Sequence, residues 1–219
     1  MSSDFVAAID LGSNSFHMIV ARIANGHVQI LDRLREMVQL AAGLDSHHRL
    51  SAESQQRALD CLARFGQRLR HIPPARLRIV GTNTLRQARN SAEFVARAEQ
   101  LLGHRVEIVS GQEEARLIYL GVAHSVGDVA GQRLVVDIGG GSTELIIGEQ
   151  FDPVHLASLR MGCVSMTRGC FDDGRITANR LREAELLVQL NLEPVREAYL
   201  ARGWQVATGA SGSIKAIQD

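Results

Sequence analysis

The sequence predicts a duplicated α/β fold, in which two halves repeat the same order of strands and helices. The first half is expected to run through three strands and then to alternate helix and strand, ending on a helix. The second half restarts with three strands, a helix, a strand and the beginning of another helix. A repeat without gaps aligns Asp10–Val20 with Asp137–Ile147, with identical aspartate, glycine, serine and isoleucine positions. Because self-similarity of this kind marks a duplicated architecture, we expect one domain at residues 1–124 and a second at residues 125–219.

Apolar runs and turn residues give the elements of the first half. Asn25-Gly26 predicts a tight hairpin, and Pro73-Pro74 ends a helix whose apolar residues recur at helical spacing. Capping boxes at residues 90–93 and 110–113 open two more helices, expected to end near residues 102 and 124. The expected strands are residues 5–9, 16–23, 27–33, 77–80 and 106–109, and the first helix is residues 51–70.

The second half follows the same order but stops earlier. We expect strands at residues 134–137, 144–147, 154–161 and 204–208, and helices at residues 178–201 and from 211 onward. The last strand and helix of the first half have no counterpart after this point, so the second copy is expected to be incomplete at its C-terminus.

Composition places the chain among ordinary globular proteins. It has 219 residues, 45% of them hydrophobic and 22% charged, with a formal net charge of zero. A neutral chain is not expected to bind DNA through its whole surface. Three widely spaced cysteines without a CxxC pair, no apolar run long enough to span a membrane and no signal-peptide pattern predict a reducing cytoplasm.

Two matching glycine turns are the strongest indication of a phosphate site. Each turn follows a strand that ends in aspartate, and each points several backbone N–H groups toward one place, which suits phosphate oxygens. Ser13 and Asn14 lie in the first turn. Gly139, Gly140, Gly141 and Ser142 form the second.

Two carboxylates flank the second turn. Asp137 and Glu144 would repel a phosphate unless a cation lay between them, and hard oxygen ligands suit Mg²⁺. In the first copy His17 stands where the second has Glu144, so the Mg²⁺ is expected at the second turn only.

A pair of adjacent carboxylates begins the helix predicted after residue 110. Glu113 occupies the third helical position, where its ordinary role is to reach back to the Ser110 amide. Glu114 points about a hundred degrees further around the helix and is not used by that cap. If one of the two activates water, the spacing favours Glu114.

Two further segments join a strand end to a helix start. The segment Gly81–Arg89 carries Arg86, and the segment Gly209–Lys215 carries Ser211 and Gly212. Helix N-termini attract anions, and arginine adds a planar cationic group, so both segments are candidate phosphate contacts.

Five motifs together resemble the exopolyphosphatase/guanosine pentaphosphate phosphatase family. They occur in order along most of the chain, at residues 10–18, 81–88, 110–116, 137–144 and 160–164. The resemblance implies the duplicated actin-like fold of sugar kinases and heat-shock 70 proteins. It also implies that Glu114 activates water, that Asp137 and Glu144 bring Mg²⁺ to the terminal phosphate, that the two turns hold phosphate and that Arg86 lies in the cleft between domains.

The expected activity is Mg²⁺-dependent hydrolysis of the terminal phosphate of inorganic polyphosphate, with guanosine pentaphosphate as the alternative substrate. The runs at residues 139–142 and 160–165 favour polyphosphate, whereas those at residues 72–75 and 119–124 favour the alternative. A remoter alternative is an actin-like ATP-dependent kinase. For the full-length protein we expect a homodimer in the cytoplasm or at the periphery of the inner membrane.

The geometric expectation is that the two turns face one another across a cleft between the domains. Ser13-Asn14 and Gly140-Gly141 would then line one crevice, with Glu114 and Arg86 on its first-domain wall.

Overall fold

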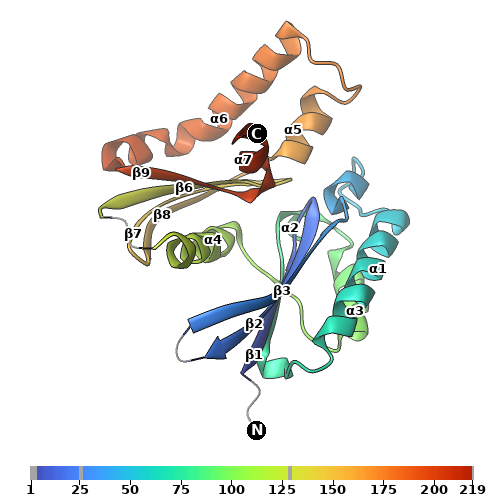
Figure 1. Ribbon diagram of the computed structural model, residues 1–219. Coiled ribbons are helices and arrows are strands. Elements are labelled where there is room, and N and C mark those ends of the chain that lie inside the picture. The colour runs from blue at the N-terminus through green and yellow to red at the C-terminus, as the bar shows by residue number, and fades with distance from the viewer. Residues whose placement is uncertain (1–3, 25–26, 128–129, 219) are drawn as a thin grey trace. The chain divides into compact units, whose positions relative to one another are not determined.

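The computed structural model describes residues 4–24, 27–127 and 130–218 and divides the chain into two compact units. Unit 1 ends at Val109 and unit 2 begins at Ser110. Figure 1 shows the elements of both units. Each unit contains one mixed β-sheet and its own covering helices, which confirms the duplicated α/β organisation.

Unit 1 is built on a five-stranded sheet of order β3-β2-β1-β4-β5. Strand β2 is antiparallel to both β1 and β3, whereas β4 runs parallel to β1 and β5 parallel to β4. The elements in chain order are β1 (Phe5–Leu11), β2 (Ser15–Ala24), β3 (His27–Met37), η1 (Leu40–Gly43), α1 (Ala52–Leu69), η2 (Pro74–Arg76), β4 (Leu77–Gly81), α2 (Asn83–Gln87), α3 (Ser91–Leu102) and β5 (Glu107–Ile108). The hairpin residues Asn25-Gly26 lie outside the described residues, but the strands on either side of them pair as expected.

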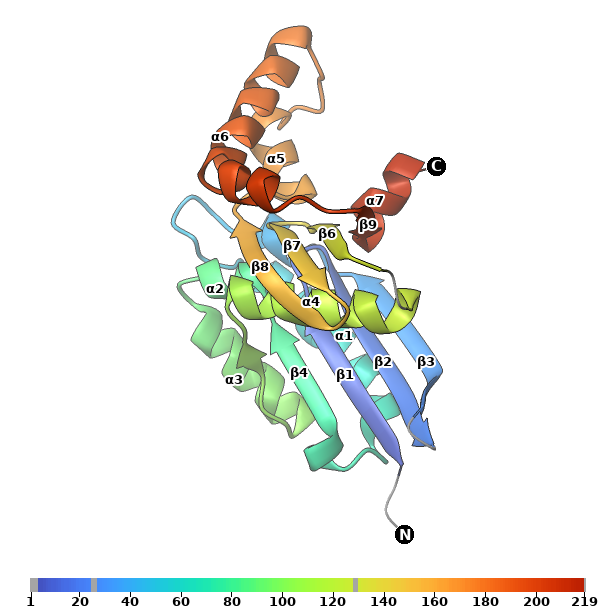
Figure 2. The same cartoon turned by 90° about the vertical axis from the view of Figure 1, so that its left-hand side faces the viewer.

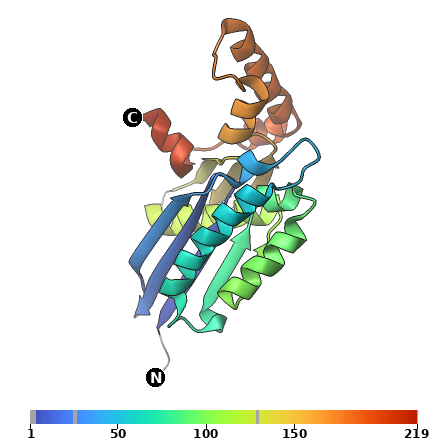
Figure 3. The same ribbon diagram turned by 90° about the vertical axis from the view of Figure 1, so that its right-hand side faces the viewer.

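Helices α1 and α3 cover one face of this sheet (Figure 3). Ser51 begins α1, because its hydroxyl accepts a hydrogen bond from the Ser54 N–H at 3.2 Å. The apolar stripe predicted for α1 is buried, and it packs against alternate side chains of β1 and β2. The residues concerned are Ala58, Leu62, Phe65 and Leu69 of α1 and Ile9, Leu11, Phe16 and Met18 of the strands.

Unit 2 is built on a four-stranded sheet of order β8-β7-β6-β9. Strand β9 is parallel to β6 in the same way as β4 is parallel to β1, and β7 and β8 are antiparallel to their neighbours. A counterpart of β5 is not found among the described residues. The elements are α4 (Gly111–Val126), β6 (Gln132–Ile138), β7 (Thr143–Glu149), β8 (Asp152–Leu159), α5 (Cys163–Cys170), α6 (Ala178–Arg202), β9 (Val206–Ala210) and α7 (Ser211–Gln218).

The sheet of unit 2 lies between two helices, α4 on one face and α6 on the other (Figures 1 and 2). Tyr119 of α4 is fully buried, and its ring packs over Gly148 of β7, where an added Cβ would lie 2.4 Å from the ring. Tyr199 of α6 covers the opposite face and donates a hydrogen bond from its hydroxyl to the Leu145 carbonyl at 2.6 Å. The two faces of the sheet therefore have separate apolar cores.

Helix α4 corrects the expected division at residues 124 and 125. The sequence places this helix at the end of the first domain, but its buried residues pack against β6 and β7 of the second sheet. The compact units consequently divide about one helix earlier, between Val109 and Ser110. Alternation of strands and helices shows where a helix lies along the chain but not which sheet it covers.

Two local expectations are also corrected. Asn90 does not cap α3 with its side chain; its amide instead accepts from the Leu50 N–H at 2.8 Å and donates to the Leu50 carbonyl at 3.0 Å. Helix α5 is absent from the sequence prediction, because a short helix rich in β-branched and small residues has little periodicity to reveal it.

No helix in the described ranges combines the length and the apolar character needed to cross a lipid bilayer.

Candidate functional site

Two carboxylates face each other at one end of the second sheet. Asp137 near the end of β6 pairs directly with Glu144 near the start of β7. Glu144 is only 1% exposed, and its Oε1 accepts a hydrogen bond from the Ser158 hydroxyl at 2.8 Å. The Asp137 Oδ1 atom is buried and has no hydrogen-bond partner among the described residues. A buried carboxylate oxygen in this condition is suited to a cation.

The charge state of this pair reflects its burial. Desolvation, followed by the negative charge of Glu114, raises the pKa of Glu144 to about 8, although hydrogen bonds from Ser158 and Ser142 oppose the shift. Desolvation also raises the pKa of Asp137, against a hydrogen bond from Ser211. A cation bound here would hold both groups in their charged forms.

Glu114 belongs to the same unit as these carboxylates. It lies half-buried in the first turn of α4, close enough to Glu144 for its charge to raise the Glu144 pKa. The hydroxyl of Ser110 caps this turn by accepting from the Glu113 N–H at 3.1 Å. Glu113 itself binds Arg116 through both carboxylate oxygens, each at 2.8 Å. The structure thus separates the two glutamates, with Glu113 in a surface ion pair and Glu114 beside the Asp137–Glu144 pair.

The second glycine turn joins the two carboxylate-bearing strands. The Gly139 N–H donates to the Ser142 carbonyl at 2.9 Å and closes the turn. Ser142 is 4% exposed, and its side chain is hydrogen-bonded to Glu144. The turn and the carboxylates therefore form one connected site, as the repeat predicts.

Ser211 brings the end of β9 to this site. Strand β9 is parallel to β6 with Ala210 opposite Asp137, so the next residue lies beside the carboxylate. The Ser211 hydroxyl donates to the Ile138 carbonyl at 2.9 Å and also binds Asp137. Its φ of 79° is unusual for a residue other than glycine, and such strain clusters at functional sites. Gly212 follows it and is exposed.

The first glycine turn is held in a similar way within unit 1. Leu11 of β1 pairs with Gly81 of the parallel strand β4, so the turn after β1 and helix α2 after β4 lie at the same edge of the sheet. Ser13 is 6% exposed, and its hydroxyl accepts from the Thr84 hydroxyl at 2.8 Å. Asn14 is half-buried in this turn.

Arg86 of α2 reaches the last residue of unit 1. Its Nη1 donates to the Val109 carbonyl at 2.8 Å, immediately before Ser110. His17 pairs with Asp10 as Glu144 pairs with Asp137, which confirms the asymmetry of the two turns. The first turn lacks the second acidic group because position 17 is histidine. Partial burial and the charge of Arg35 lower the pKa of His17, which favours its neutral form.

The structure groups the candidate residues into two sets. Unit 1 brings together Ser13, Asn14 and the segment that carries Arg86, and unit 2 brings together Glu114, Asp137, Glu144, the glycine turn and Ser211. Placing Glu114 in unit 2 corrects the expectation that it lies on the first-domain wall. That the two turns face one another stays a prediction.

Two hydroxyl residues of the site were not predicted from the sequence. Ser158 on β8 binds Glu144, and Thr84 on α2 binds Ser13. Thr84 stands within the segment already singled out at residues 81–89. No local motif surrounds Ser158, and only the pairing of β7 with β8, which places it opposite Glu144, reveals it.

The Mg²⁺ ligands predicted from the sequence have suitable donor atoms, but two carboxylates alone do not complete the coordination of the ion. The available oxygen of Asp137 and the adjacent Glu144 are hard donors of the kind Mg²⁺ takes. Within the described part of the chain, no group of three or more His, Cys, Asp or Glu side chains is arranged to hold a metal ion. Mg²⁺ commonly completes its coordination with water and substrate phosphate, so two carboxylates are enough protein ligands for a Mg²⁺ site.

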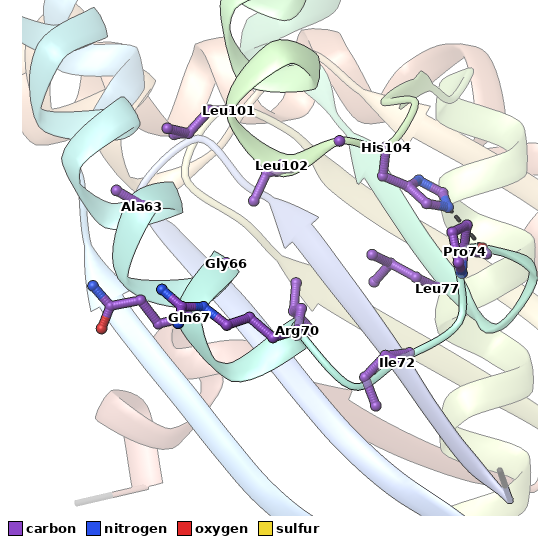
Figure 4. Close-up of a pocket in the computed structure, with 12 residues that line it drawn as sticks. Ala63, Gly66, Gln67, Arg70, Ile72, Pro74, Leu77, Leu101, Leu102 and His104 are labelled. Carbon is purple, nitrogen blue, oxygen red and sulfur yellow. Dashed lines mark hydrogen bonds between the residues drawn. The ribbon is translucent and has the colours of Figure 1, made fainter.

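A cavity of about 550 Å³ in unit 1 lies elsewhere (Figure 4). It is lined by the ends of α1 and α3 and by the start of β4, with the His104 Nε2 2.8 Å from the Pro74 carbonyl. Leu77, at the first position of β4, borders the cavity, whereas Gly81 and the phosphate turn lie at the other end of that strand. The cavity is therefore separate from the candidate site.

Comparisons with known proteins agree with the fold. A family model described as the Ppx/GppA phosphatase family matches residues 19–219. The guanosine-5'-triphosphate,3'-diphosphate pyrophosphatase of Vibrio cholerae is 51% identical over 219 residues, which is 100% of this chain and 44% of that protein. The chain thus spans less than half the length of the curated relatives it matches.

Solved structures extend the agreement to three dimensions. An exopolyphosphatase-like protein of known crystal structure gives a TM-score of 0.91 at 31% identity, covering 99% of this chain and 68% of that one. An exopolyphosphatase from Cytophaga hutchinsonii gives a TM-score of 0.87 at 25% identity, covering 97% and 68%. The expected actin-like α/β fold is confirmed. On this evidence the chain belongs to the Ppx/GppA phosphatase family.

Proposed function

We propose that this protein hydrolyses a terminal phosphoanhydride bond, with the catalytic carboxylate on α4. The observation that carries the proposal is the grouping of Glu114, Asp137 and Glu144 beside one glycine turn within unit 2. An acidic cluster beside a turn that suits phosphate makes chemical sense when a cation and a water molecule lie between them. Membership of a phosphatase family supports the same reaction class.

Glu114 is proposed as the general base. The water oxygen forms a bond to the terminal phosphorus as the bridging P–O bond breaks, and one water proton passes to the Glu114 carboxylate. The products are inorganic phosphate and the substrate shortened by one phosphate. Phosphoryl transfer of this kind depends mainly on positioning and on neutralising charge, which the backbone amides of the glycine turn supply from the protein.

Asp137 and Glu144 are the residues that would hold Mg²⁺, with Ser142, Ser158 and Ser211 orienting their carboxylates. When bound, the ion would neutralise the phosphate charge and keep both carboxylates ionised. Ser211-Gly212 and the first turn, Ser13-Asn14, are proposed as further phosphate contacts, and Arg86 as a cationic contact from unit 1.

Guanosine pentaphosphate is the substrate that we propose first, in place of the polyphosphate that the sequence motifs favour. The names of the curated relatives at about half identity, such as the Vibrio cholerae protein, support guanosine pentaphosphate. Polyphosphate stays the second candidate, because two of the solved structures carry exopolyphosphatase in their titles. Both substrates end in a phosphoanhydride, so one site serves either, and the choice depends on what binds the rest of the molecule.

The deciding experiment measures phosphate release from guanosine pentaphosphate, polyphosphate and ATP, with and without Mg²⁺. We expect Mg²⁺-dependent release with the highest kcat/KM for guanosine pentaphosphate. A higher kcat/KM for polyphosphate would reverse the order of the two substrates. Release from none of the three would contradict the proposed function, and phosphate transfer from ATP to an acceptor would favour the kinase alternative.

A further inference from the structure

The glycine turn of unit 2 is held from behind by the first turn of α5. The Cys163 N–H donates to the Gly139 carbonyl at 2.9 Å. The Val164 and Ser165 N–H groups donate to the Gly140 carbonyl at 2.8 and 3.1 Å. Three of the N–H groups that an isolated helix leaves without partners are thus directed at two carbonyls of the turn.

This arrangement fixes the direction of two amides in the turn. A trans peptide points its C=O and its N–H to opposite sides, and the described residues contain no cis peptide bond. Because the carbonyls of Gly139 and Gly140 point toward α5, the N–H groups of Gly140 and Gly141 point away from it. Neither N–H donates to a backbone or side-chain acceptor in the described part of the chain. Gly140 is half-buried and Gly141 is buried, so an anion reaching these N–H groups would be largely shielded from water.

Gly162 permits the close approach of α5 to the turn. Its φ is −156°, an extended conformation that any residue adopts, so conformation does not require glycine here. The available space does require glycine, because an added Cβ would lie 2.6 Å from both the Gly140 carbonyl carbon and the Gly141 nitrogen. Those are backbone atoms of the turn, which cannot move aside without displacing it.

A related arrangement occurs in unit 1, one position later in the turn, because Ser13 and Asn14 align with Gly140 and Gly141 in the repeat. There the N–H groups of Ala41 and Gln39 donate to the carbonyls of Ser13 and Asn14 at 2.9 and 2.8 Å. These donors come from η1 and its preceding residue, which follow the third strand of unit 1 as α5 follows the third strand of unit 2. Both copies therefore hold the carbonyl side of the turn with the helical segment after the third strand.

We propose that Gly162 and the first turn of α5 are positioning residues for substrate phosphate. They orient the Gly140 and Gly141 N–H groups toward the anion. The hydrogen bonds from the helix N-terminus to the carbonyls also polarise the two peptide groups, which makes their N–H groups stronger donors. The inference rests on the proposed function, in which this turn binds phosphate.

The first test compares two glycine-to-alanine variants in the same segment. In Gly162→Ala the new methyl group displaces the turn, whereas an added Cβ at Gly169 of α5 meets nothing within 4 Å. We expect Gly162→Ala to raise KM by about 10–100-fold, the value of hydrogen bonds to a charged group, with kcat changed by less than about threefold. Gly169→Ala should match the unmodified protein. A fall in kcat with unchanged KM would indicate a smaller folded fraction and would contradict positioning.

The second test removes the N–H donor of residue 163 and follows the NMR signals of the Gly140 and Gly141 amides. Proline is accepted at the first helical position after an extended residue, so Cys163→Pro should keep α5 but lose the bond to Gly139 and press on its carbonyl. Cys163→Ala keeps the N–H and is the matched control. Inorganic phosphate is titrated into ¹⁵N-labelled protein, and the Gly140 and Gly141 amide resonances are followed.

We expect those resonances to shift with phosphate in the unmodified protein and in Cys163→Ala, and to respond at least about tenfold more weakly in Cys163→Pro. No shift in the unmodified protein, or an equal response in Cys163→Pro, would overturn the inference. Because this readout needs no hydrolysis, a normal amide response without phosphate release from any substrate would contradict the proposed function alone. If Gly162→Ala fails to fold, the proline variant and the unmodified protein still decide.

Discussion

Three acidic side chains of unit 2 stand in different environments, and each environment suits a different role. Glu144 is buried and hydrogen-bonded to serine hydroxyls, Asp137 keeps a buried oxygen available, and Glu114 is half-buried at a helix start. Glu113, one residue earlier, is held by Arg116. Neighbouring residues of identical chemistry are therefore expected to respond very differently to substitution.

Replacing Glu114 by glutamine should lower kcat by about 10²–10⁴-fold, because the variant cannot accept the water proton. Substrate binding should change little, since glutamine has almost the same size. Glu113→Gln is the matched control and should retain nearly full activity, because its carboxylate is in an ion pair on the surface. Steady-state phosphate release measures both variants, and an inactive Glu113→Gln beside an active Glu114→Gln would reverse the assignment.

The metal prediction concerns the two opposed carboxylates. Asp137→Asn and Glu144→Gln should each raise the Mg²⁺ concentration for half-maximal activity by on the order of tenfold or more, since each removes a charged oxygen donor. Titration of Mg²⁺ into chelator-treated protein measures this shift. Full activity of the unmodified protein after chelation would contradict the Mg²⁺ requirement.

Cys61 gives a prediction that is independent of activity. Burial, together with the negative charge of Glu36, raises the pKa of this thiol from 9.0 to about 12. Because thiolate is the reactive form, Cys61 should react with a thiol reagent at pH 8 only after unfolding, whereas the half-buried Cys163 and Cys170 react in the folded protein.

The same shift gives the sign of the pH effect for Cys61. The folded thiol holds its proton above pH 9 while the unfolded one loses it, so the free energy of unfolding should fall as the pH rises from 9 toward 12. Cys61 should have no effect on the pH dependence of stability near pH 7. Counting labelled thiols by mass spectrometry before and after denaturation checks the reactivity; rapid labelling of Cys61 in the folded state would contradict it.

At the scale of elements, the Asn90 side chain makes two hydrogen bonds to the backbone that connect the starts of α1 and α3. Asn90, at the start of α3, binds both the N–H and the carbonyl of Leu50, which precedes α1. The amide side chain thus joins two helix starts that lie forty residues apart in the chain. Its burial makes these bonds costly to lose.

Asn90→Ala should therefore lower the free energy of unfolding by about 1–3 kcal/mol, chiefly by leaving the Leu50 N–H without a partner. The Leu50 carbonyl keeps a bond from the Gln55 side chain at 3.1 Å, so the loss is smaller than for two orphaned groups. Asn90→Asp keeps an acceptor for the Leu50 N–H and should lose less. Urea denaturation measures both variants, and equal stability of Asn90→Ala and the unmodified protein would refute the role.

At the scale of the whole molecule, the two units have separate cores. Tyr119 and α4 belong to the core of unit 2, whereas the core of unit 1 is closed by α1 and α3. The proposed base on α4 is consequently attached to the sheet that carries Asp137 and Glu144. This attachment keeps the proposed base and the proposed metal ligands in one compact unit.

Tyr119→Ala should destabilise unit 2 selectively, by about 3–5 kcal/mol, because it empties a fully buried aromatic position. Hydrogen exchange read by mass spectrometry should show faster exchange in β6, β7 and β8, with β1 and β4 unchanged. Leu62→Ala, which is equally buried in unit 1, is the matched control and should show the reverse pattern. Faster exchange in unit 1 of the Tyr119 variant would mean that α4 supports both sheets.

The sequence by itself determined the duplication, the order of the strands and of every helix longer than α5, the two turns and the acidic residues beside the second turn. It could do so because periodicity, glycine turns and the Asp10/Asp137 repeat are local properties that need only a few neighbouring residues. Tertiary structure alone decided that α4 covers the second sheet, that Asn90 binds Leu50 rather than capping α3, and that α5 supports the Gly139–Ser142 turn. Each of these depends on contacts between distant residues, such as Tyr119 over Gly148 and Gly162 against Gly140, and packing selects those partners by shape and burial rather than by any pattern within one segment.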